Sequence, residues 1–230
     1  MLWRASEITG YAIEGIDGHV GSIHDLLFSH DDWRLRWLVV DTGKWLPGRK
    51  IVVPIHVADK PNAVRKEIVV ELSLQQATQS PDIDVSGPVS RQAEATLYQH
   101  YGWPPYWDGT PDHADPLRGV HQVLGLHIQA TDHAVGHVDD FLVSDDDWSL
   151  RYMVADTRNW LPGRKVLVAP RWIGDIHWEK RDVAVKLTRE QVRNGPPYDP
   201  SVASIVIDPS EEEGLERVDP FPVGSGKPGA

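Results

Sequence analysis

Histidine and carboxylate side chains are the groups in this sequence that could do chemistry. Eleven histidines occur among the 230 residues. Those that stand close together or beside carboxylates are His19, His24 and His30, and then His133 and His137 with Asp139 and Asp140. Imidazole and carboxylate groups can bind a metal ion or change charge near neutral pH, so a metal- or pH-responsive stress protein is one alternative. No spacing among them matches a recognised metal-binding motif, and we expect a scattered, solvated set.

Other patterns that could support catalysis are absent or incomplete. The run Asp145–Asp147 lacks the alternating oxygen ligands and the glycine of a calcium loop, and we interpret it as a turn. The segment Gly224–Lys227 is similar to a phosphate-binding loop, but Pro228 stands where that loop requires Ser or Thr. The sequence contains no cysteine, which excludes thiolate nucleophiles and disulfides. We therefore predict that the protein is not an enzyme and has no catalytic residue, cofactor or metal.

The composition is that of a globular protein with an acidic surface. Hydrophobic residues make up 40% and charged residues 25% of the chain, as in ordinary soluble domains. The formal net charge of −11 would repel a phosphate backbone, so we expect no nucleic-acid partner. No apolar run approaches the roughly 20 residues of a membrane-spanning helix, and the start of the chain lacks the apolar stretch of a secretion signal. We expect a cytoplasmic protein without membrane insertion.

The elements that must position these residues are organised as an internal repeat. Trp148 follows Trp33 by 115 positions, and the segment Leu46–Lys50 recurs with identical residues at Leu161–Lys165. The same offset relates Gly10 to Gly125, Asp17 to Asp132, Gly21 to Gly136, Asp25 to Asp140, Asp41-Thr42 to Asp156-Thr157, and Trp45 to Trp160. Each copy is too long for a solenoid repeat and long enough for its own core. The predicted domains are a first copy at 1–87, a connector at 88–115, a second copy at 116–200, and an acidic, Pro/Gly-rich tail at 201–230.

Each copy is predicted to be a small β domain that ends in a short helix. In the first copy, β-branched runs between turn residues predict strands at Tyr11–Ile13, Val20–Phe28, Leu35–Thr42, Lys50–Val53 and Glu67–Leu72. The strand Leu35–Thr42 is apolar on both faces, so it needs cover from the connector or from the other copy. After the last strand, Ser73-x-x-Gln76 and Thr188-x-x-Gln191 each predict a capping box and a helix.

The connector begins as a predicted helix and continues as an aromatic segment. Ala93, Leu97 and Tyr101 recur at helical spacing after Ser90, which is a candidate N-cap. Residues 103–107 read Trp-Pro-Pro-Tyr-Trp, and we name this segment the strap. Paired prolines favour an extended path, so we expect the strap to pack along a surface, where it either closes the two copies together or faces a partner.

Three segments resemble the PRC-barrel family, which is named after the photosynthetic reaction centre: Val39–Thr42, Trp45–Lys50 and Val52–Pro54, together with their counterparts in the second copy. The stretch 88–107 is also similar to the segment that follows the barrel in bacterial members. The resemblance implies a mainly β fold of two small antiparallel barrels in tandem, and it brings no catalytic residues. Relatives include the cytoplasmic part of the reaction-centre H subunit and the C-terminal domain of ribosome maturation factors, and both bind other macromolecules.

These observations predict a non-enzymatic protein-binding or assembly module. Its expected partner is another protein, and a second copy of the chain in a homodimer would fit this class. The resemblance leaves two further alternatives, a ribosome- or RNA-associated maturation factor and a subunit associated with the photosynthetic reaction centre. Aromatic and arginine side chains on rigid turns are typical interface anchors, although a Trp-Leu-Pro-Gly-Arg turn could instead cap its own barrel. The candidate interaction surface consists of Trp45, Pro47, Arg49, Trp160, Pro162, Arg164, Trp103, Tyr106 and Trp107.

Overall fold

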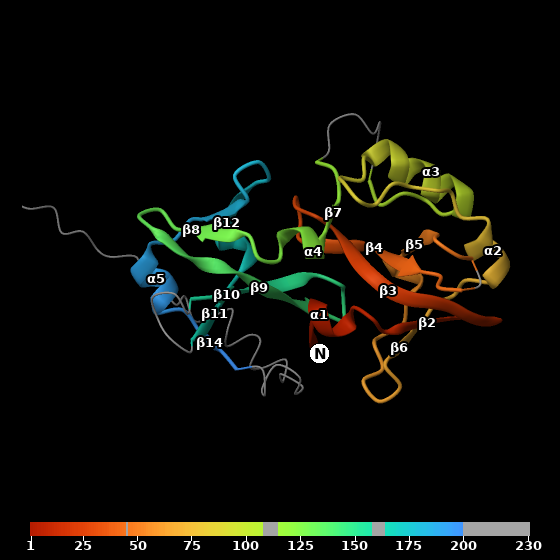
Figure 1. Ribbon diagram of the computed structural model, residues 1–230, viewed down its shortest axis with the longest axis horizontal. Helices are drawn as coiled ribbons and strands as arrows, with labels where there is room; N and C mark the ends of the chain where they lie inside the picture. The colour runs from red at the N-terminus through yellow and green to blue at the C-terminus, as the bar shows by residue number, and fades with distance from the viewer. Residues whose placement is uncertain (45, 108–114, 158–163, 200–230) are drawn as a thin grey trace, which may run out of the picture. The chain divides into compact units, whose positions relative to one another are not determined.

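The computed structural model describes residues 1–44, 46–107, 115–157 and 164–199. Three candidate residues, Trp45, Trp160 and Pro162, and the predicted tail 201–230 therefore lie outside the described residues. The described chain is mainly β (Figure 1). It divides into two compact units. The larger is formed by residues 3–124 and 141–151, and the smaller by residues 1–2, 125–140 and 152 onward.

The larger unit contains a sheet with the strand order β5-β4-β3-β2-β6, and β7 pairs with β3. These strands are β2 (Ala12–Gly15), β3 (Gly18–Ser29), β4 (Arg34–Asp41), β5 (Lys50–Pro54), β6 (Glu67–Val69) and β7 (Arg118–Gly119). Neighbours are antiparallel except β2 and β6, which run parallel. All five strands predicted for the first copy are present, with ends that differ by a few residues.

Short helices accompany this sheet, and the capping signals at Ser73 and Ser90 predicted two of them, α2 and α3. They are α1 (Ala5–Ile8), the 3-10 turn η1 (Ile55–Val57), α2 (Leu74–Thr78), α3 (Arg91–Tyr101) and α4 (Val120–Val123). The Ser73 hydroxyl accepts from the backbone N–H of Gln76, and the Gln76 side chain accepts from that of Ser73, which confirms the predicted capping box. Ser90 caps α3 in the predicted way, through the N–H of Ala93.

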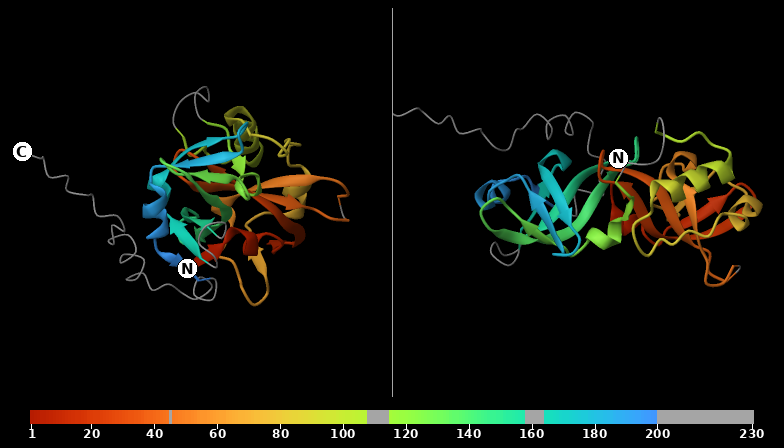
Figure 2. Two further views of the ribbon diagram at one scale, coloured as in Figure 1. Left: turned by 60° about the vertical axis from the view of Figure 1, so that its left-hand side comes forward. Right: turned by 90° about the horizontal axis from the view of Figure 1, so that it is seen from above.

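The residues near the start and just after the end of the connector lie next to each other. Val89 and Leu117 form a two-way backbone bridge, with N···O distances of 2.9 and 2.8 Å. Between these residues α3 lies along the strands of the larger unit (Figure 1 and Figure 2). No helix in the described part of the chain is long and apolar enough to cross a membrane.

The interior strand β4 is buried on both faces, as its sequence predicts. Leu35, Trp37, Leu38, Val39 and Val40 are each at most 1% exposed. On the side of Trp37 the cover comes from α3, because the Trp37 ring lies 4.9 Å from that of Tyr98. The connector helix is thus one source of the cover that the doubly apolar strand requires.

Two tight strand contacts in the structure require glycine. At Gly21 in β3, φ is +155°, and a Cβ atom would lie 2.2 Å from the carbonyl oxygen of Asp41. At Gly136, 115 positions later, φ is +134° and a Cβ atom would lie 1.9 Å from the carbonyl oxygen of Asp156. No side chain fits at such distances, so the pairing of each strand with its neighbour depends on a residue without Cβ.

The smaller unit is built on a second sheet with the order β12-β13-β8-β9-β10-β11-β14, and β1 pairs with β9. Its elements are β1 (Leu2–Arg4), β8 (His127–Gln129), β9 (Ala134–Ser144), β10 (Leu150–Asp156), β11 (Lys165–Val168), η2 (Pro170–Trp172), β12 (Ile173–His177), β13 (Asp182–Val185), α5 (Arg189–Arg193) and β14 (Pro197–Tyr198). The ends of β9 and β10 that flank residues 145–149, and residues 3 and 4 of β1, belong to the larger unit. Within the described residues both sheets are open series of paired strands.

Several local contacts in one unit recur in the other at the offset of 115 residues. A capping box at Thr188 and Gln191 begins α5, as predicted. The Asp17 carboxylate accepts from the backbone N–H of Leu74 at 2.7 Å, and the Asp132 carboxylate accepts from that of Arg189 at 2.8 Å. Equivalent sequence positions therefore make equivalent contacts.

Candidate functional site

The way in which helix α3 ends determines the position of the strap. Helix α3 ends at Tyr101 and is capped by Gly102, which has φ +72°, a left-handed conformation that glycine adopts at little cost. The reversal turns the chain back, so that Trp103 stacks on Tyr101 with ring centroids 4.9 Å apart and lies 5.0 Å from the ring of His56. Tyr101 itself is fixed because its hydroxyl donates to the carbonyl oxygen of Val52 at 3.0 Å.

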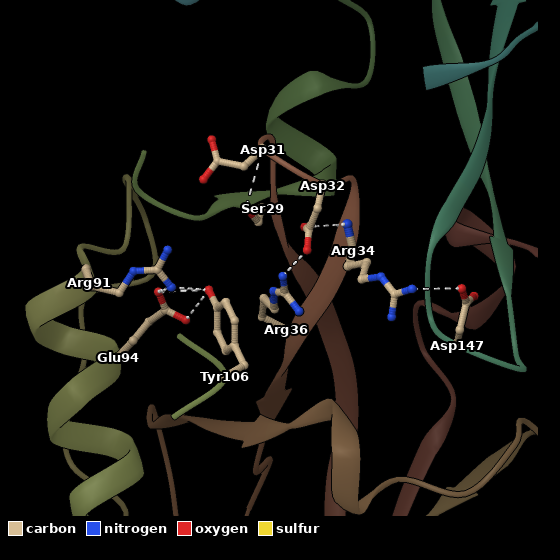
Figure 3. A network of polar contacts seen from close by, with 9 residues as sticks. All are labelled: Ser29, Asp31, Asp32, Arg34, Arg36, Arg91, Glu94, Tyr106 and Asp147. Atoms are coloured by element: carbon tan, nitrogen blue, oxygen red, sulfur yellow. Dashed lines mark hydrogen bonds and ion pairs between the residues drawn. The ribbon is translucent and has the colours of Figure 1, made fainter. Parts of the chain in front are cut away.

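Tyr106, which belongs to the strap, lies between an arginine of β4 and an arginine of α3. The guanidinium carbon of Arg36 lies 3.7 Å from the centroid of the Tyr106 ring, and that of Arg91 lies 4.9 Å from it. Arg91 also lies 4.5 Å from the centroid of Trp107. Cations over aromatic faces attract the ring quadrupole, so this Arg-Tyr-Arg arrangement orders the strap against β4 and α3 (Figure 3).

Glu94 is the buried anion beneath this arrangement. Its side chain is 1% exposed and forms an ion pair with Arg91 at 3.2 Å. It accepts hydrogen bonds from the Trp37 indole N–H at 3.0 Å and from the Tyr106 hydroxyl at 3.2 Å. Burial raises the pKa of Glu94 above its ordinary value, although these donors and the arginines oppose the shift. Burial also raises the pKa of Tyr106 to about 12, so its hydroxyl stays protonated at neutral pH and can donate to Glu94.

The two arginines beside Tyr106 are each paired with a carboxylate, so the charges around this ring are locally balanced. Arg36 pairs with Asp32, and Arg91 pairs with Glu94 and also donates to the hydroxyl of Tyr106. Such an arrangement can order a surface and present aromatic area, but it leaves little uncompensated charge for an ionic ligand. Within the described residues no group of three His, Asp or Glu side chains could hold a metal ion.

Part of the predicted surface gathers in this cluster. Trp103 and Trp107 are half-buried, Pro104 and Pro105 are exposed, and Tyr106 is 38% exposed. The strap thus packs along the larger unit while it keeps one side open to solvent. Sequence reasoning found the strap but missed its partners Arg36, Arg91, Glu94 and Trp37. The sequence contained one indication of these contacts. Glu94 lies in the first turn of α3, and this helix follows a strand whose two apolar faces need cover.

The arginine of each Leu-Pro-Gly-Arg turn donates to backbone carbonyl oxygens within its own unit. The Arg49 guanidinium donates to the carbonyl oxygens of Thr78, at 3.0 Å, and Ser80. In the smaller unit, Arg164 donates to the carbonyl oxygen of Gly195 at 3.2 Å. Each arginine therefore anchors the chain after the short helix that follows the last strand, while Pro47 is exposed. These contacts agree with a structural role for the turns.

A second polar group links β3 to α4. The Asp25 carboxylate, 5% exposed, accepts from the backbone N–H groups of Leu26 at 2.8 Å and His121 at 3.2 Å, and also pairs with the His121 ring. The His24 ring nitrogen lies 2.8 Å from the Lys50 ammonium group. His24 and His121 thus stabilise the attachment of β5 and α4, although His121 was not among the histidines that the sequence singled out. Within the described residues, no group of three His, Asp or Glu side chains that could hold a metal ion includes the predicted histidines.

Comparison with known proteins gives one family match. The model of the PRC-barrel domain matches residues 3–74, which include the strands from β2 to β6 and end at the start of α2. The match stops before α3 and the strap. No curated protein matches the chain.

Proposed function

We propose that this protein is a non-enzymatic, cytoplasmic module for protein binding or assembly, built from two PRC-type β-barrel domains in tandem. The observation that carries the proposal is the ordered, partly exposed strap over Arg36 and Arg91. Its residue types, Trp, Tyr and Arg, are those that contribute most binding energy at protein interfaces. Because internal contacts already order them, a partner would lose less conformational entropy on binding them.

The tandem arrangement is supported by contacts that recur at equivalent positions. Gly21 and Gly136 make the same close approach, and Asp17 and Asp132 make the same contact to a helix start. Lys66 and Arg181, also 115 positions apart, both have positive φ, at 51° and 56°. A side chain with Cβ adopts this conformation at a cost, so its recurrence favours a shared fold over chance.

The strap distinguishes the two copies, and this difference supports its functional role. It follows the first copy only, and it is attached through contacts to β4 and α3 rather than through strand pairing. A feature added to one of two similar domains can be specialised without a change in their common core. We therefore assign partner recognition to the strap, with Tyr106 at its centre.

Site-specific photocrosslinking in the native cell tests this proposal. A photoreactive amino acid at position 104, which is exposed in the strap, should yield one recurrent adduct with a protein. The matched control carries the same amino acid at Ile16, which is 70% exposed in the turn between β2 and β3. Adducts at position 104 that do not exceed those at position 16 would overturn the proposal, and an adduct with nucleic acid would replace it by the ribosome- or RNA-associated alternative.

A further inference from the structure

Two hairpin tips in the larger unit have the same internal structure. We define the first tip as residues 29–35, between β3 and β4, and the second tip as residues 144–150, between β9 and β10. In each tip a serine hydroxyl accepts from the backbone N–H two residues later at 3.3 Å, Ser29 from Asp31 and Ser144 from Asp146. Each tip also contains a tryptophan with positive φ, at 55° for Trp33 and 56° for Trp148.

The two tips contact each other reciprocally. The backbone N–H of Leu35 donates to the carbonyl oxygen of Trp148 at 2.9 Å, and that of Leu150 donates to the carbonyl oxygen of Trp33 at 2.7 Å. Between them, Arg34 and Ser149 form an antiparallel bridge. Leu35 and Leu150, Trp33 and Trp148, and Arg34 and Ser149 are each 115 positions apart. Exchange of the two tips thus reproduces the same contacts, which is the property of an isologous dimer interface.

Neighbouring strands repeat this reciprocity. Strand β7, at the start of the second copy, pairs with the end of β3 through Leu27 and Gly119. Strand β1, at the start of the first copy, pairs with β9, and the Trp3 indole N–H donates to Asp145 at 2.9 Å. Each copy therefore receives a short strand from the segment that begins the other copy.

Aromatic side chains bury the contact between the two tips, which we call the joint. Trp33 and Trp148 are each only 9% exposed. The Trp33 ring stacks on Phe28, with centroids 5.6 Å apart, and lies 6.0 Å from Phe141 of the second copy. Arg34 adds a charge contact to Asp147 at 3.3 Å (Figure 3). The joint thus combines strand pairing, buried aromatic area and an ion pair.

We propose that the two tips form a homodimer-type interface made within one chain, and that this interface holds the two copies together without the covalent connector. The partner that each tip fits is a second hairpin tip of the same kind, which the chain supplies itself. This inference rests on the tandem arrangement in the proposed function, but it concerns a surface other than the strap. Covalent fusion raises the local concentration of the second tip, so each tip is occupied by the other rather than by another molecule.

Cleavage of the full-length chain tests this inference. A specific protease site that replaces residues 109–113 allows the folded protein to be cut, and native mass spectrometry and light scattering then report whether the pieces separate. We expect the cut protein to remain one species of unchanged mass at ~10 µM. Separation of the pieces at this concentration without denaturant would overturn the inference.

Matched tip variants show whether the tips carry the association. Trp33→Ala and Trp148→Ala are equivalent changes, so each should weaken the association of the cut pieces by about tenfold or more, and by similar factors. Ile16→Ala, in an exposed turn, should leave it unchanged. Circular dichroism of the uncut variants checks that they fold. Trp variants that fold and associate as tightly as the parent would also overturn the inference. Crosslinking at position 104 does not depend on this joint, so the two proposals can fail separately.

Discussion

Replacement of Gly21 by alanine is the sharpest test of how the sheet of the larger unit is built. Gly21 combines a positive φ of +155° with a close approach, because an added Cβ would lie 2.2 Å from the Asp41 carbonyl oxygen and 2.9 Å from a methyl group of Val40. Gly10 has a positive φ of +91°, but an added Cβ would have nothing within 4 Å. The pair therefore separates the cost of the backbone conformation from the cost of the steric clash.

The expected magnitudes follow from these two costs. A positive φ in a residue with Cβ costs about 1–2 kcal/mol, which is the whole expected loss of unfolding free energy for Gly10→Ala. A forced displacement of packed backbone adds roughly 1–3 kcal/mol, so Gly21→Ala should lose about 2–5 kcal/mol in total. Gly136→Ala should behave like Gly21→Ala, since its Cβ would lie 1.9 Å from the Asp156 carbonyl oxygen.

Urea unfolding followed by circular dichroism measures these differences. The midpoint should fall clearly further for Gly21→Ala and Gly136→Ala than for Gly10→Ala, at an unchanged slope. Equal midpoints for Gly10→Ala and Gly21→Ala would refute the reasoning, because the clash would then contribute nothing. A loss for Gly21→Ala without a similar loss for Gly136→Ala would refute the equivalence of the two positions.

Three further predictions concern single contacts. Burial raises the pKa of Glu94, so the folded state binds this proton more tightly than the unfolded state. The free energy of unfolding should fall as the pH rises from the ordinary value of 4.5 through the raised pKa. Urea midpoints at several pH values measure this slope, and its persistence in Glu94→Gln would contradict the assignment. Ser73→Ala and Thr188→Ala should each cost about 1 kcal/mol in the same assay, and no change in either would argue against the capping boxes. Tyr101→Phe should cost about 1 kcal/mol in thermal unfolding, because it removes the hydrogen bond to Val52, and an unaltered melting temperature would exclude that bond.

The parts of the fold that the sequence predicts are those set by local patterns. The doubly apolar strand at Leu35–Thr42, the capping boxes and the helix after Ser90 all depend on residues close together in the chain, and all are confirmed. The parallel pairing of β2 with β6 was not predicted, because strand order depends on contacts between distant segments. The alternation of polar and apolar residues indicates which face of a strand is buried, but it does not indicate which strands lie beside it.

The candidate site shows the same limit. The composition of the strap indicated that it would pack on a surface, but the identity of that surface depends on Arg36 in β4, which no local pattern connects with Tyr106. The run Asp145–Asp147 was correctly interpreted as a turn from its composition. The reciprocal pairing of the two tips was not predicted, because the backbone donors that form it, such as the N–H of Leu35, are not visible in a pattern of side chains.

The two-way bridge between Val89 and Leu117 has a consequence for how this protein can change. The segment between these two residues forms a closed loop, and the entropy cost of closing a loop depends only weakly on its length. The segment can therefore become longer, become shorter or be replaced at little entropic cost. Insertions between these residues would leave the flanking strands in register. Natural variation in length and sequence should therefore concentrate in this segment, while the strands that precede and follow it stay constant.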